Sequence, residues 1–233
     1  TWTFTPTQDF NGNVQLSFGV SDGQITTNQN IAVTINPVND APVTAPVTLA
    51  ATEDTSVTFT NAQLIGSSYD IDSSTLTAVN VTATNGTIVD NGNGTWTFTP
   101  AANYNGVANL SFGVSDGFLT TPSSATINIA AVNDASVVTP VSYTINEDNS
   151  LLITANDLLT HASDVDNTAG QLSVTNVSYT GSNGTLVDNG NGTWTFTPTQ
   201  DFNGNVQLSF GVSDGQITTN QNIAVTINPV NDA

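Results

Sequence analysis

The chain contains an internal repeat, and this feature constrains its fold more than any other. Residues 1–41 recur without a single change as residues 193–233. A diverged copy lies between them, so that Trp2, Trp96 and Trp194 are 94 and 98 positions apart. A period of about 95 residues has the size of a domain and is too long for a solenoid repeat. We therefore expect several copies of one domain type.

The period divides the chain into three parts. Residues 42–135 and 136–233 are two full copies, and the second carries four extra residues. Residues 1–41 match only the C-terminal part of a copy, so the sequence looks like an excerpt from a longer chain. The first linker, Val38 to Ala41, is flanked by two prolines and is short. Because proline cannot join a strand ladder, we expect neighbouring domains to lie close together across it.

Each full copy alternates apolar and polar residues in short runs. In Thr95-Trp96-Thr97-Phe98-Thr99 the aromatic residues share one face, as in a half-buried strand. Asn-Gly pairs separate such runs and are typical of tight hairpin turns. The first full copy is predicted to contain seven strands, at 44–51, 56–60, 75–84, 86–90, 95–99, 108–114 and 124–131. Single helical turns are expected near 61–65 and 155–160. This pattern predicts an all-β chain of tandem immunoglobulin-like, antiparallel Greek-key β-sandwiches with the tryptophans in the core.

The charge balance excludes several functions. The chain has no Lys or Arg, 19 acidic residues and a formal net charge of −19. Such a chain cannot neutralise phosphates, so we expect neither nucleic-acid binding nor attraction to anionic membranes. There is no run of about 18 apolar residues and no cysteine, so membrane insertion and disulfides are not expected either. Bound metal cations would relieve the self-repulsion of the carboxylates.

Counting strands shows at which end of the sandwich each carboxylate is expected, because successive strands run in opposite directions. The Glu53-Asp54 turn and the Asn103 loop then meet the linker at one end of a copy, and an Asp-x-Asp pair lies at the other end. The junction between the full copies is predicted to gather Glu53, Asp54, Asn103, Asn133, Asp134, Asp164, Asp166 and Asp214. The earlier junction is predicted to gather Asp9, Asn39, Asp40, Asp70, Asp72 and Asp116. Carboxylate and amide oxygens in flexible loops favour Ca²⁺, whereas Mg²⁺ requires a tighter octahedron and keeps its waters.

The motifs NPVNDAP, NED…DVD and FNG…SFGVSDG resemble those of bacterial cadherin-like tandem repeats of about 95 residues. These repeats occur in giant secreted surface adhesins, including the RTX type, and the resemblance covers essentially the whole chain. It implies Ca²⁺-rigidified extender domains, secreted to the bacterial cell surface and involved in adhesion and biofilm formation. It also implies that Glu53, Asn133, Asp134, Asp164, Asp166 and Asp214 are metal ligands. The family often has a third acid after the Asp-x-Asp pair. Ser74 or Thr168-Ala169 stands nearby here instead, which leaves open a weaker site or fewer ions.

Other functions are less well supported by the sequence. His161, the only histidine, occurs in one copy and has no partner base or nucleophile, so no enzymatic activity and no small-molecule substrate are expected. Asp90 and Asp188 stand beside Asn-Gly turns and are expected to serve those turns. A glycan- or protein-binding module and a homophilic adhesion domain remain alternatives to the spacer. We expect a monomer whose partners are the neighbouring repeats of the same chain.

Overall fold

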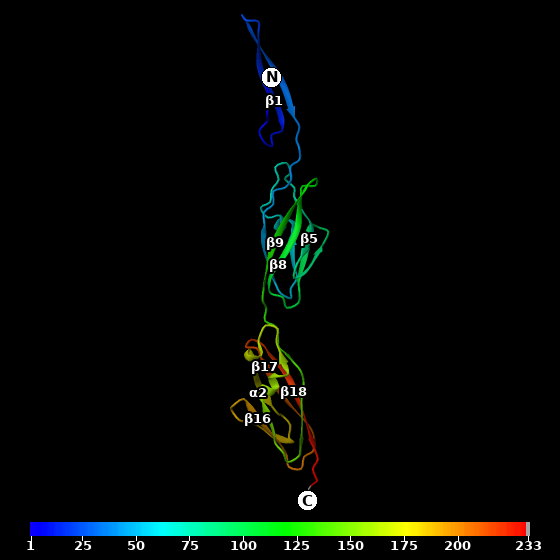
Figure 1. Ribbon diagram of the computed structural model, residues 1–233. Coiled ribbons are helices and arrows are strands. Elements are labelled where there is room, and N and C mark those ends of the chain that lie inside the picture. The colour runs from blue at the N-terminus through cyan, green and yellow to red at the C-terminus, as the bar shows by residue number, and fades with distance from the viewer. Residues whose placement is uncertain (232–233) are drawn as a thin grey trace. The chain divides into compact units, whose positions relative to one another are not determined.

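The computed structural model describes residues 1–231 and consists mainly of strands (Figure 1). The chain forms two compact units, one from Thr1 to Val132 and the other from Asn133 onward. Residues 232–233, the end of the predicted second full copy, lie outside the described residues.

Unit 1 begins with a long hairpin, formed by β1 (Gly12–Ser21) and β2 (Thr26–Ile35) and drawn in blue in Figure 1. The two strands pair over their whole length, from Gly12↔Ile35 to Ser21↔Thr26. A hollow of about 620 Å³ runs along its apolar side, lined by Trp2, Phe4, Leu16, Phe18 and Ile31 among others. The apolar residues of the hairpin thus remain accessible to solvent.

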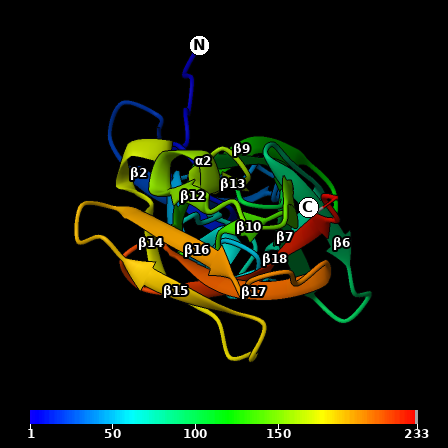
Figure 2. The same cartoon turned by 90° about the horizontal axis from the view of Figure 1, so that it is seen from below.

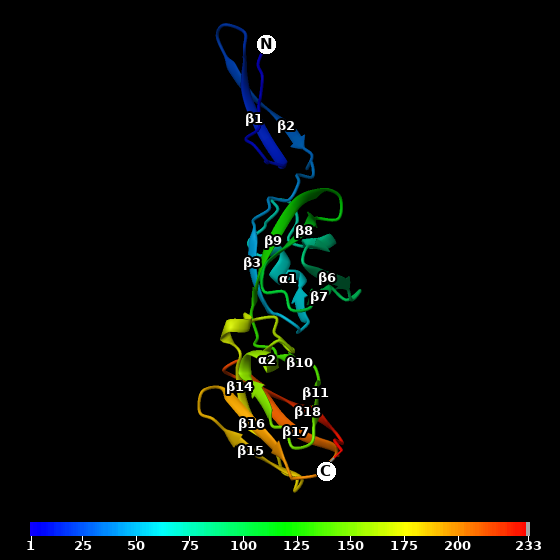
Figure 3. The ribbon, with the colours of Figure 1, turned by 60° about the horizontal axis from the view of Figure 1, so that its bottom comes forward.

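The rest of unit 1 is a two-sheet sandwich (Figure 3). One sheet has the order β3 (Val47–Thr52), β9 (Thr120–Ala130), β8 (Gly106–Ser115) and β5 (Thr77–Ala83). The other has the order β4 (Val57–Thr60), β7 (Thr95–Pro100) and β6 (Gly86–Asp90). A single helical turn, α1 (Asn61–Ile65), follows β4 and starts with a capping box between Thr60 and Gln63.

Unit 2 repeats this sandwich, and its sheets are seen from below in Figure 2. Its four-stranded sheet has the order β11 (Val141–Asn146), β18 (Thr218–Asn228), β17 (Gly204–Ser213) and β14 (Ser173–Ser178). Its three-stranded sheet has the order β12 (Leu151–Thr154), β16 (Thr193–Pro198) and β15 (Gly184–Asp188). Further short elements are β10 (Val137–Val138), which pairs with β13 (Ala162–Ser163), then α2 (Ala155–Leu159) and the 3₁₀ turn η1 (Ala169–Gln171).

The predicted fold class is confirmed, with one difference in strand pairing. The first strand of each sandwich pairs in parallel with the last, β3 with β9 and β11 with β18. When seven strands alternate in direction, the first and the seventh run the same way, so they must be parallel if they are neighbours. The remaining neighbours in both sandwiches are antiparallel, as predicted.

The prediction that all three tryptophans are core residues is confirmed for two and wrong for one. Trp96 and Trp194 are buried in their sandwiches, with exposed fractions of 5% and 8%. Trp2 is 99% exposed. The strand of Trp194, β16, pairs with both β12 and β15. Within the hairpin part of unit 1, no strand takes their place, so the same side chain remains in solvent.

The two identical segments provide a matched stability test. Trp194→Ala is expected to lower the unfolding free energy of unit 2 by about 3–5 kcal/mol, because a large buried ring is lost. Trp2→Ala should change the unfolding free energy by no more than about 0.5 kcal/mol, as expected for an exposed site. Differential scanning calorimetry of the two variants measures both effects. Equal effects of the two substitutions would contradict the difference in burial.

Candidate metal-binding clusters

Each unit contains an acidic cluster where a linker meets the sandwich that follows it. The first linker cluster consists of Asn39, Asp40, Asp70, Asp72 and Asp116. The second linker cluster consists of the equivalent residues Asn133, Asp134, Asp164, Asp166 and Asp214. All ten side chains were predicted from the sequence to lie at a junction, and within each unit the structure brings each set of five together.

The linker is attached to the sandwich by the same two hydrogen bonds in both clusters. The Asn39 side-chain amide donates to Asp116 Oδ2 at 2.7 Å, and the backbone N–H of Asp40 donates to Asp72 Oδ2 at 2.8 Å. In unit 2 the corresponding distances, from Asn133 to Asp214 and from Asp134 to Asp166, are 2.9 Å and 2.7 Å. The repetition of both bonds shows that the sequence motif encodes a defined local geometry.

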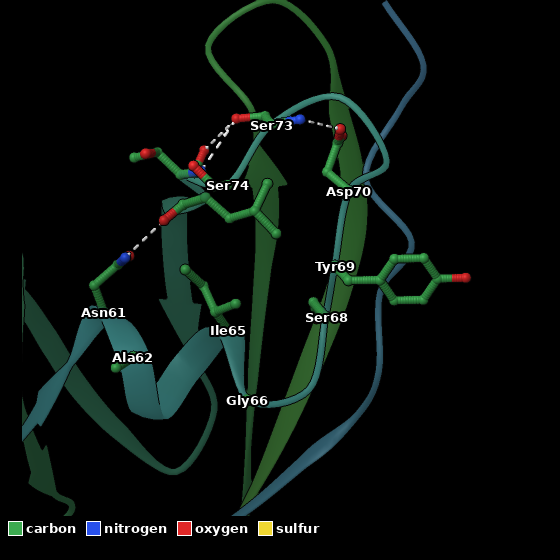
Figure 4. A pocket seen from close by; sticks show the side chains of 11 residues that line it. Asn61, Ala62, Ile65, Gly66, Ser68, Tyr69, Asp70, Ser73 and Ser74 are labelled. Carbon is green, nitrogen blue, oxygen red and sulfur yellow. Dashed lines mark hydrogen bonds between the residues drawn. The ribbon is translucent and has the colours of Figure 1, made fainter. Parts of the chain in front are cut away.

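The aspartates of the clusters are also held by backbone N–H groups of their own turns. Asp70 Oδ1 accepts from the N–H groups of Asp72 and Ser73, and Figure 4 shows the bond from Ser73. Asp116 Oδ1 accepts from Phe118 and Leu119 at 2.7 Å each. Short Asp side chains form such turns readily, since they can bond to backbone two and three residues further on. The turns hold the carboxylates in place.

These donors lower the pKa of three carboxyl groups in the clusters. The amide of Asn39, followed by the Leu119 and Phe118 N–H groups, holds the pKa of Asp116 below its usual value. The Ile217 N–H, the Asn133 amide and the Gln216 N–H do the same for Asp214. Burial by itself would raise the pKa of Asp164, but hydrogen bonds, first among them that from Ser136, outweigh it and lower the pKa.

Asp40 differs from these groups because its pKa is raised. Desolvation is the main cause, and the charges of Asp9, Asp72 and Asp70 add to it. Asp9, which has a left-handed backbone conformation with φ of 59°, thus acts electrostatically on Asp40, while its predicted role as a metal ligand stays a prediction. The raised pKa of Asp40 therefore reflects desolvation first and the repulsion from neighbouring carboxylates second.

A second constellation surrounds the buried glutamate of each sandwich. Glu53 is 1% exposed, and it accepts from the backbone N–H of Val132 at 2.6 Å and from the Asn105 side chain at 3.4 Å. Asp54 accepts from the N–H of Asn103 at 3.0 Å. The predicted residues Glu53, Asp54 and Asn103 are therefore together within unit 1.

Unit 2 contains the same constellation, which the sequence analysis did not assign to a site. Glu147 is 4% exposed and accepts from the N–H of Val230 at 2.6 Å and from the Asn203 side chain at 3.2 Å. The sequence feature that could have identified this site is the alignment of Glu147-Asp148 with Glu53-Asp54. The role of Asn105 and Asn203 was missed, because their Asn-Gly pairs are typical of ordinary turns.

The other predicted carboxylates have ordinary turn functions. Asp90 Oδ1 accepts from the N–H of Gly92, and Asp188 Oδ1 accepts from that of Gly190, at 2.8 Å in both cases.

His161 Nδ1 lies 3.4 Å from the hydroxyl of Thr139.

The donor set of the clusters suits a hard divalent cation. All candidate ligands are carboxylate or amide oxygens, the groups that Ca²⁺ prefers. Asp70 Oδ2 is buried and has no hydrogen-bond partner, which leaves a negatively charged oxygen uncompensated. Among residues 1–231, however, no three acidic or histidine side chains form a ready-made metal cage. The carboxylates would have to move together around a cation.

Comparisons with known proteins point to one family. A family model described as a cadherin-like domain matches residues 1–36, 38–130 and 132–228. No curated protein matches the chain. In the part of the chain that the structure describes, no helix has the length and apolar character needed to cross a membrane.

Solved structures with a similar backbone fold have low sequence identity to this chain. Domains EC1-2 of human protocadherin-24 have 17% identity and a TM-score of 0.47, covering 81% of this chain and 95% of that chain. Domains EC1-3 of the mouse protein have 15% identity and a TM-score of 0.47, covering 94% and 80%. An endo-fucoidan hydrolase of glycoside hydrolase family 107 has 21% identity and a TM-score of 0.34 over 97% of this chain, which spans only 35% of that enzyme.

The lowered pKa of Asp116 leads to a pH-dependent prediction. A lowered folded pKa means that the stabilisation is complete above the unfolded pKa of about 3.9 and is lost as the pH falls through the folded pKa. Asn39→Ala removes the main cause, so it should lower the unfolding free energy more at neutral pH than in acid, where only its bond to the Asp40 carbonyl is lost. Urea unfolding of both proteins between neutral pH and acid measures the difference. Asn109→Ala, an exposed amide on β8, is the control and should show no such pH dependence.

Proposed function

Because the chain belongs to the family of cadherin-like domains, we propose that it is a Ca²⁺-rigidified spacer segment of a large extracellular bacterial adhesin. Cadherin-like domains are typically extracellular adhesion modules, and cadherin domains generally bind Ca²⁺. The observation that carries the proposal is the repetition of one acidic linker cluster in both units of a chain without Lys or Arg. Repetition of one domain with the same linker motif favours a role in spacing over one in recognition.

The proposed mechanism rests on the attachment of each linker to its sandwich. Asn39 and Asp40 hold the linker against the carboxylates of Asp72 and Asp116, and their equivalents do the same in unit 2. Desolvation of Asp40, together with the like charges around it, raises its pKa and so opposes its ionised form at these contacts. A bound Ca²⁺ would supply the positive charge that this chain lacks. The carboxylates could then converge, and the linker would be fixed in one orientation.

The remaining parts of the proposal concern partners and location. We expect the chain to act as a monomer, in contact with neighbouring repeats, at the surface of a bacterium. No catalytic step is proposed. The role of Glu53, Asp54 and Asn103 as ligands stays a prediction, and each of these residues also has a structural hydrogen bond within unit 1.

Calcium should stabilise the chain strongly. At a free Ca²⁺ concentration about 100 times the Kd, one site adds about 2.7 kcal/mol to the unfolding free energy. For a domain of this size that corresponds to a rise in Tm of roughly 10–20 °C. The measurement is a thermal melt with excess chelator, with CaCl₂ and with MgCl₂. Asp72→Asn and Asp166→Asn should each remove most of the rise in their own unit. Coincident melts in chelator and CaCl₂ would refute the proposal.

Glutamate 53 allows its structural role and its predicted metal role to be separated. Without Ca²⁺, Glu53→Gln keeps an acceptor for the Val132 N–H, so it should cost about 1 kcal/mol, less than Glu53→Ala. With Ca²⁺, Glu53→Gln should reduce the gain in Tm, because an amide is a weaker ligand than a carboxylate. Thermal melts of Glu53→Gln and Glu53→Ala, each with chelator and with CaCl₂, measure both effects. An undiminished gain in Glu53→Gln would exclude Glu53 as a ligand.

A further inference from the structure

We propose that Ser136 and Gln216 are built-in hydrogen-bond donors that lower the Ca²⁺ affinity of the second linker cluster below that of the first. The inference rests on the proposed function. It adds that the two clusters bind Ca²⁺ at different concentrations. It comes from a comparison of two clusters that share the hydrogen bonds attaching the linker and differ in three neighbouring side chains.

The first difference concerns the leading aspartate of the Asp-x-Asp pair. In unit 2 the hydroxyl of Ser136 donates to Asp164 Oδ2 at 2.8 Å, and Ser136 itself is buried. The equivalent position in unit 1 is Pro42, which has no hydroxyl to donate. Asp70 Oδ2 is accordingly buried without a hydrogen-bond partner. One cluster therefore compensates this oxygen internally, and the other leaves it bare.

The second carboxylate oxygen, Oδ1, of Asp70 and Asp164 also accepts more hydrogen bonds in unit 2 than in unit 1. Asp164 Oδ1 accepts from two backbone N–H groups and also from the side chain of Asn167 at 3.3 Å. Asp70 Oδ1 accepts only from the two backbone groups, because Ser73 stands in place of Asn167 and its hydroxyl donates to the carbonyl of Thr75. Around Asp70, Ser73 and Ser74 the surface forms an open hollow of about 520 Å³ (Figure 4).

The second difference concerns the linker asparagine. The side-chain amide of Gln216 donates to Asn133 Oδ1 at 2.9 Å. The equivalent of Gln216 in unit 1 is Phe118, which is 86% exposed and cannot donate. The donation from the asparagine to its aspartate is the same in both clusters. The Oδ1 atom of Asn133 is therefore engaged by a side chain that unit 1 lacks.

These donors act against a cation because they use the same lone pairs. A hydrogen bond to a buried carboxylate oxygen removes the penalty of leaving it unsatisfied, so a cation bound there gains less. At Asp70 the penalty persists until a cation is bound. The first linker cluster should therefore fill at a lower Ca²⁺ concentration, and the second should fill as the concentration rises further.

The test is a Ca²⁺ titration of the full chain followed by ¹H–¹⁵N NMR. The backbone N–H groups of Asp40 and Asp134 report on the first and second linker cluster separately, since each donates within its own cluster. In the unmodified chain, half-saturation at Asp40 is expected at a concentration about tenfold lower than at Asp134, the size expected for one unsatisfied buried oxygen.

Two complementary variants decide the cause. Ser136→Ala with Gln216→Ala should lower the half-saturation concentration at Asp134 toward that at Asp40. Pro42→Ser with Phe118→Gln should raise the half-saturation concentration at Asp40 and leave that at Asp134 unchanged. Ser178→Ala with Gln207→Ala is the matched control, outside both clusters, and should change neither value. The second variant keeps the test decisive if the first fails to fold.

The outcomes separate this inference from the proposed function. If neither reporter responds up to ~10 mM Ca²⁺, well above the Kd range of extracellular modules, the proposed function itself fails. If both respond at the same concentration, or if Ser136→Ala with Gln216→Ala weakens binding at Asp134, Ca²⁺ binding stands and the role of the two donors is overturned. The latter result would mean that the donors position the ligands for the cation.

Discussion

The structure depends on one electrostatic constraint: the chain has 19 acidic residues and no Lys or Arg. Its carboxylates can be compensated only by backbone N–H groups, hydroxyls, amides or external cations. The clusters and the buried glutamates use the first three, as with the Val132 N–H on Glu53 and the Asn39 amide on Asp116. Two carboxylates lack such compensation. Asp70 Oδ2 has no hydrogen-bond partner, and desolvation and neighbouring carboxylates raise the pKa of Asp40. These places coincide with the linkers, so the electrostatics and the orientation of the linker are coupled.

The sequence was sufficient to predict much of this arrangement. Strict alternation in residues 95–99 predicted a strand with a buried face, and Trp96 and Phe98 are buried in the observed strand, Thr95–Pro100. Counting strand directions placed the linker residues beside the Asp-x-Asp pair, because a seven-strand alternation fixes which turns share an end. The sequence did not predict the parallel pairing of β3 with β9, since alternation gives direction but not neighbours. The donors Ser136 and Gln216 were missed because hydroxyl and amide side chains in loops have no periodic signal.

The two sandwiches show that a repeated fold tolerates local differences in its polar network. The bonds that attach the linker, from Asn133 and Asp134 to the sandwich, recur almost unchanged in unit 1. They involve backbone groups and residues of the shared motifs. The hydroxyl of Ser136 and the amide of Gln216 do not recur, and they engage side-chain oxygens that the shared motif leaves to such neighbours. Substitution at such positions changes the electrostatics of a cluster while the backbone stays the same.

The identity of residues 1–41 and 193–233 has a consequence for how the chain reaches its native state. The strands β11, β12, β14 and β15 of unit 2 are completed by β16, β17 and β18, yet the N-terminal segment offers the same side chains in the same order. Two interchangeable partners therefore compete for one half-sandwich during refolding. Chain connectivity decides the competition, because residues 193–233 follow that half directly, whereas residues 1–41 must close a loop of about 95 residues against the conformational entropy of the chain. At high protein concentration the same segment on another molecule escapes this entropic cost, so duplication without divergence makes domain exchange a hazard of refolding.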